Sequence, residues 1–183
     1  MVDVPTPEQR RLNMSRIRGR DTAPELRIRR GLHAKGLRFR LHRKTLPGKP
    51  DLIFPRYQTV VFVHGCFWHG HGCHLSKLPV TRPEFWRKKI DGNAARDRKA
   101  IMALIESGWR VLVIWECALR GPERQTEEAV IGVAVQFIRK DECACCELMG
   151  SRNRDAKLPA PGANMEHLRR HACCRGVELS ALE

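Results

Sequence analysis

The sequence predicts an α/β domain in which a mixed central sheet is flanked by helices. Two runs, Thr59–Val63 and Trp109–Trp115, are rich in β-branched and aromatic residues, as expected of strands buried on both faces. Segments with helix-capping signals alternate with these runs. At 183 residues the chain is long enough for one such domain, with some length left over.

The first clear helix begins after Thr22. Thr22 and Glu25 have the spacing of a capping box, in which each side chain accepts a hydrogen bond from the other residue's backbone N–H. The helix is expected to run to about Lys35, and Gly36 suits the position after its last turn. A shorter, strongly basic helix is expected around Gln9–Ile17.

The first three strands follow that helix. Leu37–Arg43 alternates apolar and basic residues, which is typical of a half-buried strand. The Leu46–Pro50 turn leads into a short strand at Asp51–Phe54. Pro55–Gln58 then turns the chain into Thr59–Val63, which we expect at the centre of the sheet.

A second capping box is predicted at Thr81 and Glu84, with a proline between them early in the helix, where it is tolerated. This helix is expected to reach about Ser107, with a weak point at residues 91–93. Gly108 ends it, and the Trp109–Trp115 strand follows.

A last helix is predicted over Glu123–Lys140. Beyond it the composition becomes polar and rich in Gly, Pro and Cys, without periodicity. We therefore expect one folded domain over residues 1–140 and a weakly ordered, cysteine-rich extension over residues 141–183. The cysteines and histidines of the extension match no standard zinc spacing, so a disordered extension is favoured over a second zinc site.

The charge is concentrated in the first part of the chain. Residues 1–50 carry 14 Lys and Arg against 4 Asp and Glu, whereas residues 121–183 carry 9 against 10. A basic front half favours a polyanionic partner, most simply nucleic acid, over a membrane surface. No apolar run approaches the roughly 20 residues of a membrane span, and the N-terminus lacks a signal-peptide pattern. We expect a reducing, cytoplasmic location.

A dense group of histidines and cysteines follows the central strand. Three soft ligands are close enough to converge on one metal: Cys66, His71 and Cys73. Zinc prefers four tetrahedral Cys or His ligands, and Cys117, just after a strand end, is the natural fourth. Two alternatives stay open at this point: Cys117 is a buried free thiol, or His69 or His74 replaces one of the ligands.

Asp51 is the most informative carboxylate. It stands at the head of a strand, beside the expected end of the central strand. Many nucleases present a carboxylate to Mg²⁺ in this way, and Mg²⁺ is commonly held by one or two carboxylates plus substrate phosphate. The dipeptide Pro-Asp is also common in turns, so a purely structural Asp51 is the alternative.

Several motifs in order resemble the very short patch repair endonucleases, the Vsr family. They are Leu46-Pro-Gly-Lys-Pro-Asp51, His64-Gly-Cys-Phe-Trp-His69-x-His71-x-Cys73, Thr81-Arg-Pro-Glu-Phe-Trp86, Asn93 to Asp97, and Trp109-Arg-Val-Leu-Val-Ile-Trp-Glu-Cys117-Ala-Leu-Arg-Gly. The resemblance covers roughly residues 10–140. It implies a fold like that of the restriction endonucleases. It also implies strand nicking 5′ to the thymine of a T·G mismatch that arises by deamination of 5-methylcytosine.

The resemblance also implies a role for each site residue. Asp51 would bind Mg²⁺ together with the main-chain carbonyl of Val63, although Val63 lacks the hydroxyl that some members carry there. His69, held by Asp97, would activate water, and His64 would assist at the phosphate. The structural zinc would be bound by Cys66, His71, Cys73 and Cys117. Without the resemblance, an exposed Asp97 paired with Arg96 or Arg98 is the alternative.

Aromatic residues are the expected mismatch readers. Phe67 and Trp68 are adjacent in the loop, and Trp86 opens the next helix. Apolar wedges unstack and kink DNA at a cost of a few kcal/mol per step, and a mismatch lowers that cost. Met14 resembles the residue with which the family intercalates from the other groove, although it is equally an ordinary apolar helix residue. Glu25 is expected mainly as a helix cap, with a role at the metal site left open.

The expected partner is double-stranded DNA with a T·G mismatch, bound by a monomer in the bacterial nucleoid without any membrane. Whether other mismatch-repair proteins recruit the chain stays open. Two alternative functions remain. One is a restriction-like endonuclease that cuts matched DNA, and the other is a zinc-containing DNA-binding module without catalysis.

Overall fold

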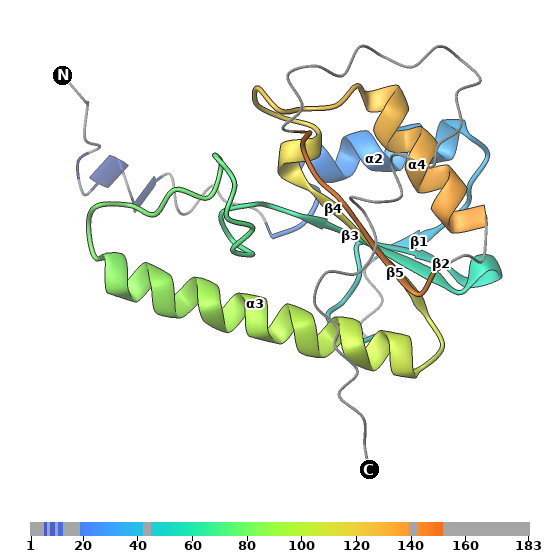
Figure 1. Ribbon diagram of the computed structural model, residues 1–183, viewed down its shortest axis with the longest axis horizontal. Helices are drawn as coiled ribbons and strands as arrows, with labels where there is room; N and C mark the ends of the chain where they lie inside the picture. The colour runs from blue at the N-terminus through green and yellow to red at the C-terminus, as the bar shows by residue number, and fades with distance from the viewer. Residues whose placement is uncertain are drawn as a thin grey trace.

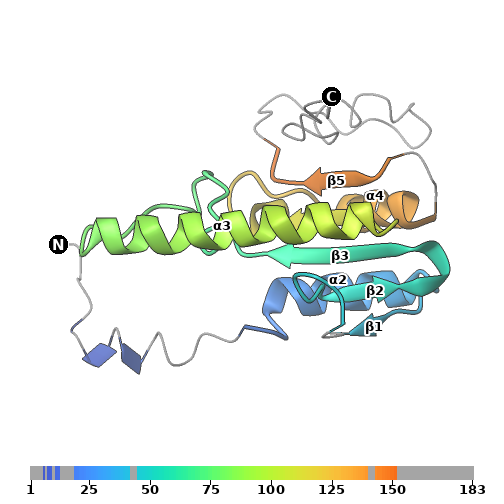
Figure 2. The same cartoon turned by 90° about the horizontal axis from the view of Figure 1, so that it is seen from below.

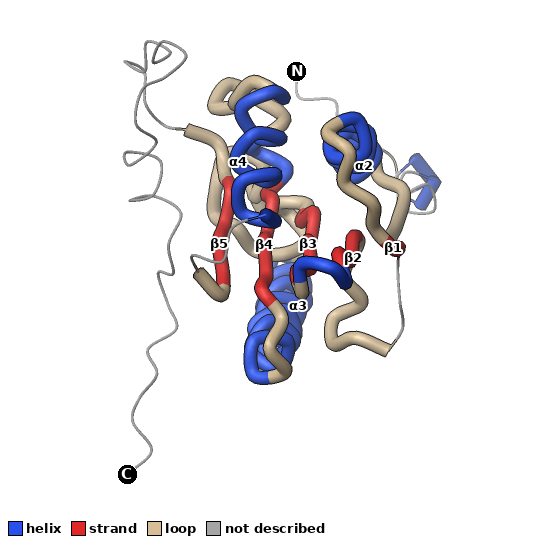
Figure 3. Tube along the Cα trace, turned by 90° about the vertical axis from the view of Figure 1, so that its right-hand side faces the viewer, coloured by secondary structure: helices blue, strands red, loops and turns tan. Residues whose placement is uncertain are grey.

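The computed structural model describes residues 6, 8–9, 11–12, 19–41, 45–139 and 143–151. In these residues a five-stranded mixed sheet is covered by α2 and α4 on one face and by α3 on the other (Figures 1 and 3). The strands are β1 (Arg40–Leu41), β2 (Leu52–Phe54), β3 (Thr59–His64), β4 (Arg110–Trp115) and β5 (Cys145–Leu148). The helices are α2 (Ala23–Ala34), α3 (Pro83–Glu106) and α4 (Glu127–Arg139). The mixed α/β architecture confirms the predicted fold class.

The strand order is β1-β2-β3-β4-β5. The first three strands are antiparallel, whereas β3, β4 and β5 are parallel and are joined by α3 and α4 as crossover helices. The central strand is β3, as predicted. Its last residue, His64, lies beside Trp115, the last residue of β4. The carboxyl ends of the two buried strands therefore meet at one edge of the sheet, where ligands bind in open α/β sheets.

The core has two layers because successive side chains of a strand point to opposite faces. Val61 and Leu112 face α2 and α4, where they pack with Ile28 and Leu32. Phe62 and its neighbours on β4 face α3. Each layer buries its apolar side chains almost completely. The two central strands therefore form a rigid base for the loops at their carboxyl ends.

Helix α2 is capped as the sequence predicts. The Thr22 side chain accepts a hydrogen bond from the Glu25 N–H at 3.4 Å, and Glu25 Oε2 accepts one from the Thr22 N–H at 3.3 Å. The helix ends at Ala34 with Lys35 as its C-cap, and Gly36 adopts a φ of 79°, which favours glycine. Arg27 on this helix also forms a 2.8 Å ion pair with Glu127, which ties α2 to α4.

The predicted capping box at the start of α3 is wrong. The N-cap is Arg82, in a left-handed conformation and without a side-chain cap hydrogen bond, so the helix starts one residue later than expected. Pro83 is the first helical residue and Glu84 the second, which breaks the spacing that a capping box needs. The predicted weak point at residues 91–93 does not interrupt the helix, because one glycine costs only about 1 kcal/mol.

The α3 helix is 24 residues long and runs past the carboxyl ends of the strands (Figure 2). Its C-terminal part buries Ala100 and Leu104 against the sheet, whereas its N-terminal part lies beside the loop that follows β3. This extension places residues of α3 next to the end of β3. None of the helices in the described ranges has both the length and the apolar character that crossing a membrane requires.

Strand β5 corrects the expectation that no regular element follows residue 140. Cys145–Leu148 pairs in parallel with β4, and Cys146 and Leu148 are buried. The strand is short and carries cysteines in place of the usual β-branched residues, which hid its signal.

Other boundaries also differ from the prediction. Strand β1 contains only Arg40–Leu41 among the described residues, and α4 begins at Glu127 rather than at Glu123. Of the expected helix at Gln9–Ile17, residues 9, 11 and 12 are helical, and the remaining positions lie outside the described residues. The cysteines and histidines beyond residue 151 also lie outside them.

Candidate active site and metal centre

Two groups of ligand-bearing side chains meet at the carboxyl ends of β3 and β4. The ligand atoms of each group all lie within 4.8 Å of one another. We call the first the metal cluster: Cys66, His71, Cys73 and Cys117. We call the second the histidine cluster: His64, His69 and Asp97. The metal cluster combines three residues of the loop after β3 with Cys117 of the segment after β4. The histidine cluster combines His64 at the end of β3, His69 of the loop and Asp97 of α3.

One distance within the metal cluster fits tetrahedral coordination of a metal ion. The Cys117 Sγ lies 3.5 Å from the His71 Nδ1. With Zn–S bonds of about 2.3 Å and Zn–N bonds of about 2.0 Å, tetrahedral ligands lie about 3.5 Å apart. Three sulfurs and one imidazole also form a donor set typical of structural zinc. The alternative ligands do not join this group, since His69 belongs to the histidine cluster and His74 faces Glu123 at 3.5 Å.

Backbone N–H groups surround the sulfurs of the metal cluster. Three of them point at a sulfur: Cys117 N–H to Cys66 at 3.3 Å, Leu75 N–H to Cys73 at 3.4 Å, and Gly150 N–H to Cys117 at 3.3 Å. Such hydrogen bonds stabilise thiolates, the form of cysteine that binds metals. Gly150 follows β5, and a Cβ there would lie 2.8 Å from the carbonyl oxygen of Cys117. The sequence prediction missed this residue because it missed β5.

Hydrogen bonds within the metal cluster shift the pKa values of its members. The hydrogen bond from the Cys66 thiol lowers the pKa of Cys117 to about 4 and raises that of Cys66. Burial lowers the pKa of His71, but its hydrogen bonds with Cys117 and Cys73 prevail and raise it to about 9. The cluster thus holds a thiolate beside an imidazolium. A metal ion that binds here must displace the protons of Cys66 and His71.

The histidine cluster contains a histidine–carboxylate pair. The His69 Nδ1 lies 2.6 Å from the Asp97 Oδ2, and each side chain is 27% exposed. Burial raises the pKa of Asp97, but the hydrogen bond and charge of His69 outweigh it, so this pKa falls below its ordinary value. An ionised carboxylate only accepts hydrogen bonds, so Nδ1 carries the proton. The Nε2 of a neutral His69 is then free to accept a proton.

His64 is the third member of the histidine cluster and contacts His69. Its ring stacks on the ring of His69, with centroids 3.8 Å apart and an interplanar angle of 3°. Burial and the neighbouring His69 lower the pKa of His64 to about 3, and Asp97 offsets this only in part. His64 is therefore a neutral imidazole at physiological pH.

The Asp51 side chain contacts the backbone near the end of β3. The Asp51 Oδ2 accepts a hydrogen bond from the Val63 N–H at 2.8 Å, which places the carboxylate one residue from His64. Asp51 is not one of the three members of the histidine cluster. A carboxylate and a main-chain carbonyl at one strand end are hard oxygen donors and suit Mg²⁺.

Glu25 is occupied elsewhere. Its carboxylate accepts the Thr22 N–H and forms an ion pair with Arg29, and the side chain is buried. Among the described residues, Glu25 belongs to neither cluster. Its capping role is therefore the one that the contacts support.

The predicted aromatic readers form one cluster. The ring centroids of Phe67 and Trp68 are 5.0 Å apart, and those of Trp68 and Trp86 are 6.0 Å apart. All three side chains are half-buried. The Nζ of Lys89 lies 5.6 Å from the Trp68 ring, within cation–π range. The fourth candidate for DNA contact, Met14, lies outside the described residues.

Helix α3 fixes the aromatic loop through a residue that the sequence prediction did not assign. The Asn93 Nδ2 donates a hydrogen bond to the carbonyl oxygen of Trp68 at 2.9 Å. Arg96 donates to the Oδ1 of Asn93, whereas Asp97 faces His69. The helical spacing of Asn93 and Asp97 puts both on the side that faces the loop. That spacing is the signal that would have identified Asn93.

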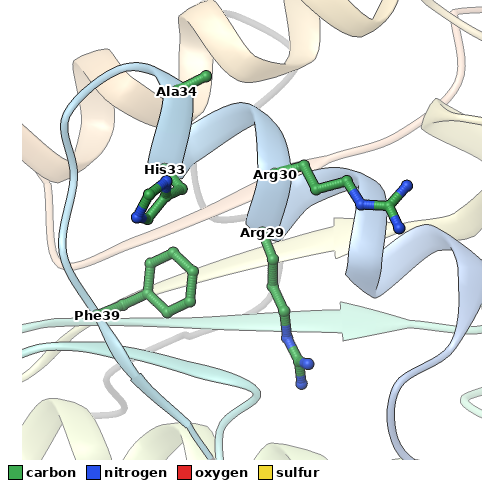
Figure 4. A pocket seen from close by; sticks show the side chains of 5 residues that line it. All are labelled: Arg29, Arg30, His33, Ala34 and Phe39. Atoms are coloured by element: carbon green, nitrogen blue, oxygen red, sulfur yellow. The ribbon is translucent and has the colours of Figure 1, made fainter.

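A shallow hollow lies at a distance from both clusters. It is lined by Arg29, Arg30, His33, Ala34 and Phe39, between α2 and the segment that leads to β1 (Figure 4). None of these side chains belongs to the metal cluster or the histidine cluster. The candidate site is therefore the strand edge and not this hollow.

Comparison with known proteins gives consistent matches. Residues 2–75 match the family described as DNA mismatch endonuclease Vsr. The chain is 52% identical to the DNA mismatch endonuclease Vsr of Escherichia coli over 130 residues, which is 71% of this chain and 83% of that protein. It is 52% identical to the type II nicking enzyme V.XorIIP of Xanthomonas oryzae over 119 residues, 65% of this chain and 88% of that enzyme. It is 41% identical to the type II nicking enzyme V.NmeAIP of Neisseria meningitidis over 120 residues, 66% of this chain and 86% of that enzyme.

Proposed function

Because this chain belongs to the DNA mismatch endonuclease Vsr family, we propose that it nicks one strand of double-stranded DNA 5′ to the thymine of a T·G mismatch, in a Mg²⁺-dependent reaction. Family membership makes the chain an endonuclease, and the base specificity, the nick position and the metal are our proposal. The observation that carries the catalytic assignment is the 2.6 Å contact between His69 and Asp97 at the end of β3.

His69 is proposed as the general base. Asp97 holds the proton on Nδ1, so that Nε2 would take the proton of the reacting water. A base placed in this way typically contributes about 10²–10⁴-fold to the rate. His64, neutral and stacked against His69, fixes the plane of the base and assists at the phosphate by hydrogen bonding.

Asp51 and the main-chain carbonyl of Val63 are proposed to hold the catalytic Mg²⁺. The Val63 N–H orients the carboxylate of Asp51 toward the strand end. When bound, Mg²⁺ would neutralise negative charge on the attacked phosphate and on the leaving oxygen.

The aromatic cluster is proposed to read the mismatch. Phe67, Trp68 and Trp86 already contact one another in the free protein, so little ordering is needed before they enter the DNA stack. Insertion costs a few kcal/mol per base step, and a mismatched step costs less to open. Met14 is proposed to contact the opposite groove.

The metal cluster is proposed to bind structural zinc and to hold the loop that carries these groups. We further propose that the fold is restriction-endonuclease-like, that the catalytic domain includes β5 and ends near Ser151, and that the remaining residues are an extension. The protein is proposed to act as a monomer.

Substitution of Asp51 tests the proposal. Asp51→Asn keeps an oxygen that can accept the Val63 N–H, so the strand end stays in place, but it removes the charge that Mg²⁺ requires. We expect Asp51→Asn to bind a T·G duplex normally and to lose nicking at every Mg²⁺ concentration, with the wild-type nick mapped 5′ to the mismatched thymine. Normal nicking by Asp51→Asn would exclude the metal assignment. Binding without nicking by the wild type would favour a non-catalytic zinc module.

A further inference from the structure

Trp115 occupies a special place between the two clusters. It is the last residue of β4 and lies in register with His64, the last residue of β3. Neighbours in register on parallel strands point to the same face of the sheet, so the two side chains are adjacent. The Trp115 side chain is 8% exposed, which leaves it little freedom to move.

The indole ring of Trp115 contacts one histidine from each cluster. It stacks on His71 of the metal cluster, with centroids 4.3 Å apart and an interplanar angle of 21°. It meets His64 of the histidine cluster edge-to-face, at 5.4 Å and 71°. A rotation of this indole would therefore displace one or both histidines.

Strand β5 fixes that rotation. The Trp115 Nε1–H donates a hydrogen bond to the Glu147 Oε2 at 3.0 Å. Glu147 lies opposite Val113 in the β4–β5 register, so it is the diagonal neighbour of Trp115 on the same face. The indole has a single N–H donor, and this contact satisfies it. Glu147 thus selects one orientation of the indole.

The His64 ring depends on such contacts. Three aromatic rings contact it. Their centroids lie 5.3 Å (Phe62), 3.8 Å (His69) and 5.4 Å (Trp115) from the centroid of the His64 ring. Phe62 lies on β3 with His64, and His69 lies in the loop that follows. Trp115 contacts the His64 ring from the neighbouring strand, β4. The His64 ring in turn stacks on the ring of His69, the proposed base.

We propose that Trp115, with its indole held by Glu147, is a positioning residue that orients His64 for DNA cleavage. The inference rests on the proposed role of the histidine cluster in nicking. Strand β5 would thereby take part in the reaction, because Glu147 contacts the indole and the indole contacts His64.

The test compares three variants that change this hydrogen bond. Glu147→Ala removes the acceptor, Trp115→Phe removes the donor but keeps an aromatic ring, and Glu147→Gln keeps a side-chain oxygen as acceptor. We expect the first two to lower kcat for a T·G duplex about tenfold with little change in KM, because a small misplacement of a catalytic group acts on the chemical step. Glu147→Gln should retain most of the wild-type kcat. All variants are assayed at a temperature at which circular dichroism shows them folded.

Two further measurements separate positioning from damage to the fold. Histidine side-chain ¹H–¹⁵N spectra should show a shifted His64 signal in Glu147→Ala and a wild-type signal in Glu147→Gln, with the distant His33 unchanged in both. Zinc content should stay at the wild-type level, since no ligand is altered. A loss of zinc in proportion to the loss of rate would overturn the inference, because the metal cluster would then be the cause.

His64→Ala distinguishes failure of this inference from failure of the proposed function. If His64→Ala nicks slowly while Glu147→Ala and Trp115→Phe nick at the wild-type kcat, the positioning role is wrong and the function stands. If His64→Ala nicks at the wild-type rate, the role of His64 in the proposed function is wrong, and the positioning role is excluded with it.

Discussion

At the scale of single residues, the site depends on pairs that come from different elements. His69 lies in the loop after β3 and Asp97 on α3, 28 positions later, yet their side chains meet at 2.6 Å. The sequence indicated both residues but left Arg96 and Arg98 as competing partners of Asp97. The structure resolves the choice because the helical phase of α3 turns Asp97 toward the loop and Arg96 toward Asn93.

Replacing the proposed base gives the first prediction. His69→Ala should slow nicking of a T·G duplex by about 10²–10⁴-fold, because the reacting water loses its proton acceptor. DNA binding, measured by fluorescence anisotropy, should change little. His33→Ala is the matched control, since this exposed histidine lies on α2 away from both clusters, and it should nick normally. A rate within threefold of the wild type for His69→Ala would contradict the assignment.

The Asp97 carboxylate gives the second prediction, which concerns pH. Its folded-state pKa lies below the ordinary 3.8 because of the contact with His69, despite the opposing effect of burial. A depressed pKa contributes stability above the ordinary value and loses it as the pH falls through the folded value. Asp97→Asn should therefore be less stable than the wild type by roughly 1 kcal/mol near neutral pH.

Urea unfolding between pH 7 and the lowest pH at which both proteins stay folded checks this expectation. The difference in unfolding free energy should be constant down to about pH 5 and should shrink below it. A difference that grows toward acid would mean that the Asp97 carboxylate is destabilising in its ionised form.

Some residue roles could be predicted from sequence and others could not. Three members of the metal cluster could be predicted because soft ligands lie close together in one loop. The fourth, Cys117, could be predicted because it follows the end of a neighbouring strand. Asn93 was left without a role, although its helical spacing to Asp97 was a signal, and Glu147 and Gly150 were missed because they act through geometry that the sequence does not encode locally. Asn93 depends on the phase of α3, and the other two depend on the pairing of β5 with β4.

At the scale of elements, local signals were reliable where they agreed with one another. Thr22, Glu25 and Gly36 together predicted the start and end of α2. The apparent capping box of α3 failed because Pro83 occupies the first helical position and moves the N-cap to Arg82. Strand β5 was missed because its stability comes from pairing with β4 and not from its own composition.

The α2 cap gives the third prediction. Thr22→Ala removes the acceptor for the Glu25 N–H and should lower the free energy of unfolding by about 1 kcal/mol. In a chain of this size that corresponds to a fall in Tm of about 2–4 °C. Thr45→Ala is the control, since this threonine lies exposed in a turn, and it should change stability by less than about 0.5 kcal/mol. Equal effects of the two substitutions would contradict the capping role.

At the scale of the whole molecule, topology brings the chemistry together. Parallel β3 and β4 end at the same edge, and the ends of these strands and the segments after them supply every member of both clusters except Asp97. The α3 crossover passes beside that edge and adds Asp97 and Trp86 (Figure 2). The sequence predicted the central strands and their order along the chain. The resemblance implied the His69–Asp97 pair, and the structure shows that the long α3 reaches past the strand ends to form it.

The metal cluster gives the fourth prediction. Wild-type protein should contain about one zinc per chain, and Cys73→Ser should lose it and unfold more easily, because metal binding contributes directly to the folding free energy. Cys145→Ser is the matched control, since Cys145 lies on β5 outside the metal cluster, and it should keep the metal. Atomic absorption and urea unfolding measure the two effects. A Cys73→Ser protein with wild-type zinc content and stability would contradict a structural zinc at this cluster.

The nicking rate on a T·G duplex, compared with a T·A duplex of otherwise identical sequence, is the decisive measurement of mismatch recognition. With Mg²⁺ present and enzyme in excess, we expect a single nick 5′ to the mismatched thymine and a rate lower by about tenfold or more on the matched duplex, since the aromatic cluster must open a fully paired step there. Equal cleavage of the two duplexes would contradict mismatch recognition and would identify a restriction-like endonuclease instead.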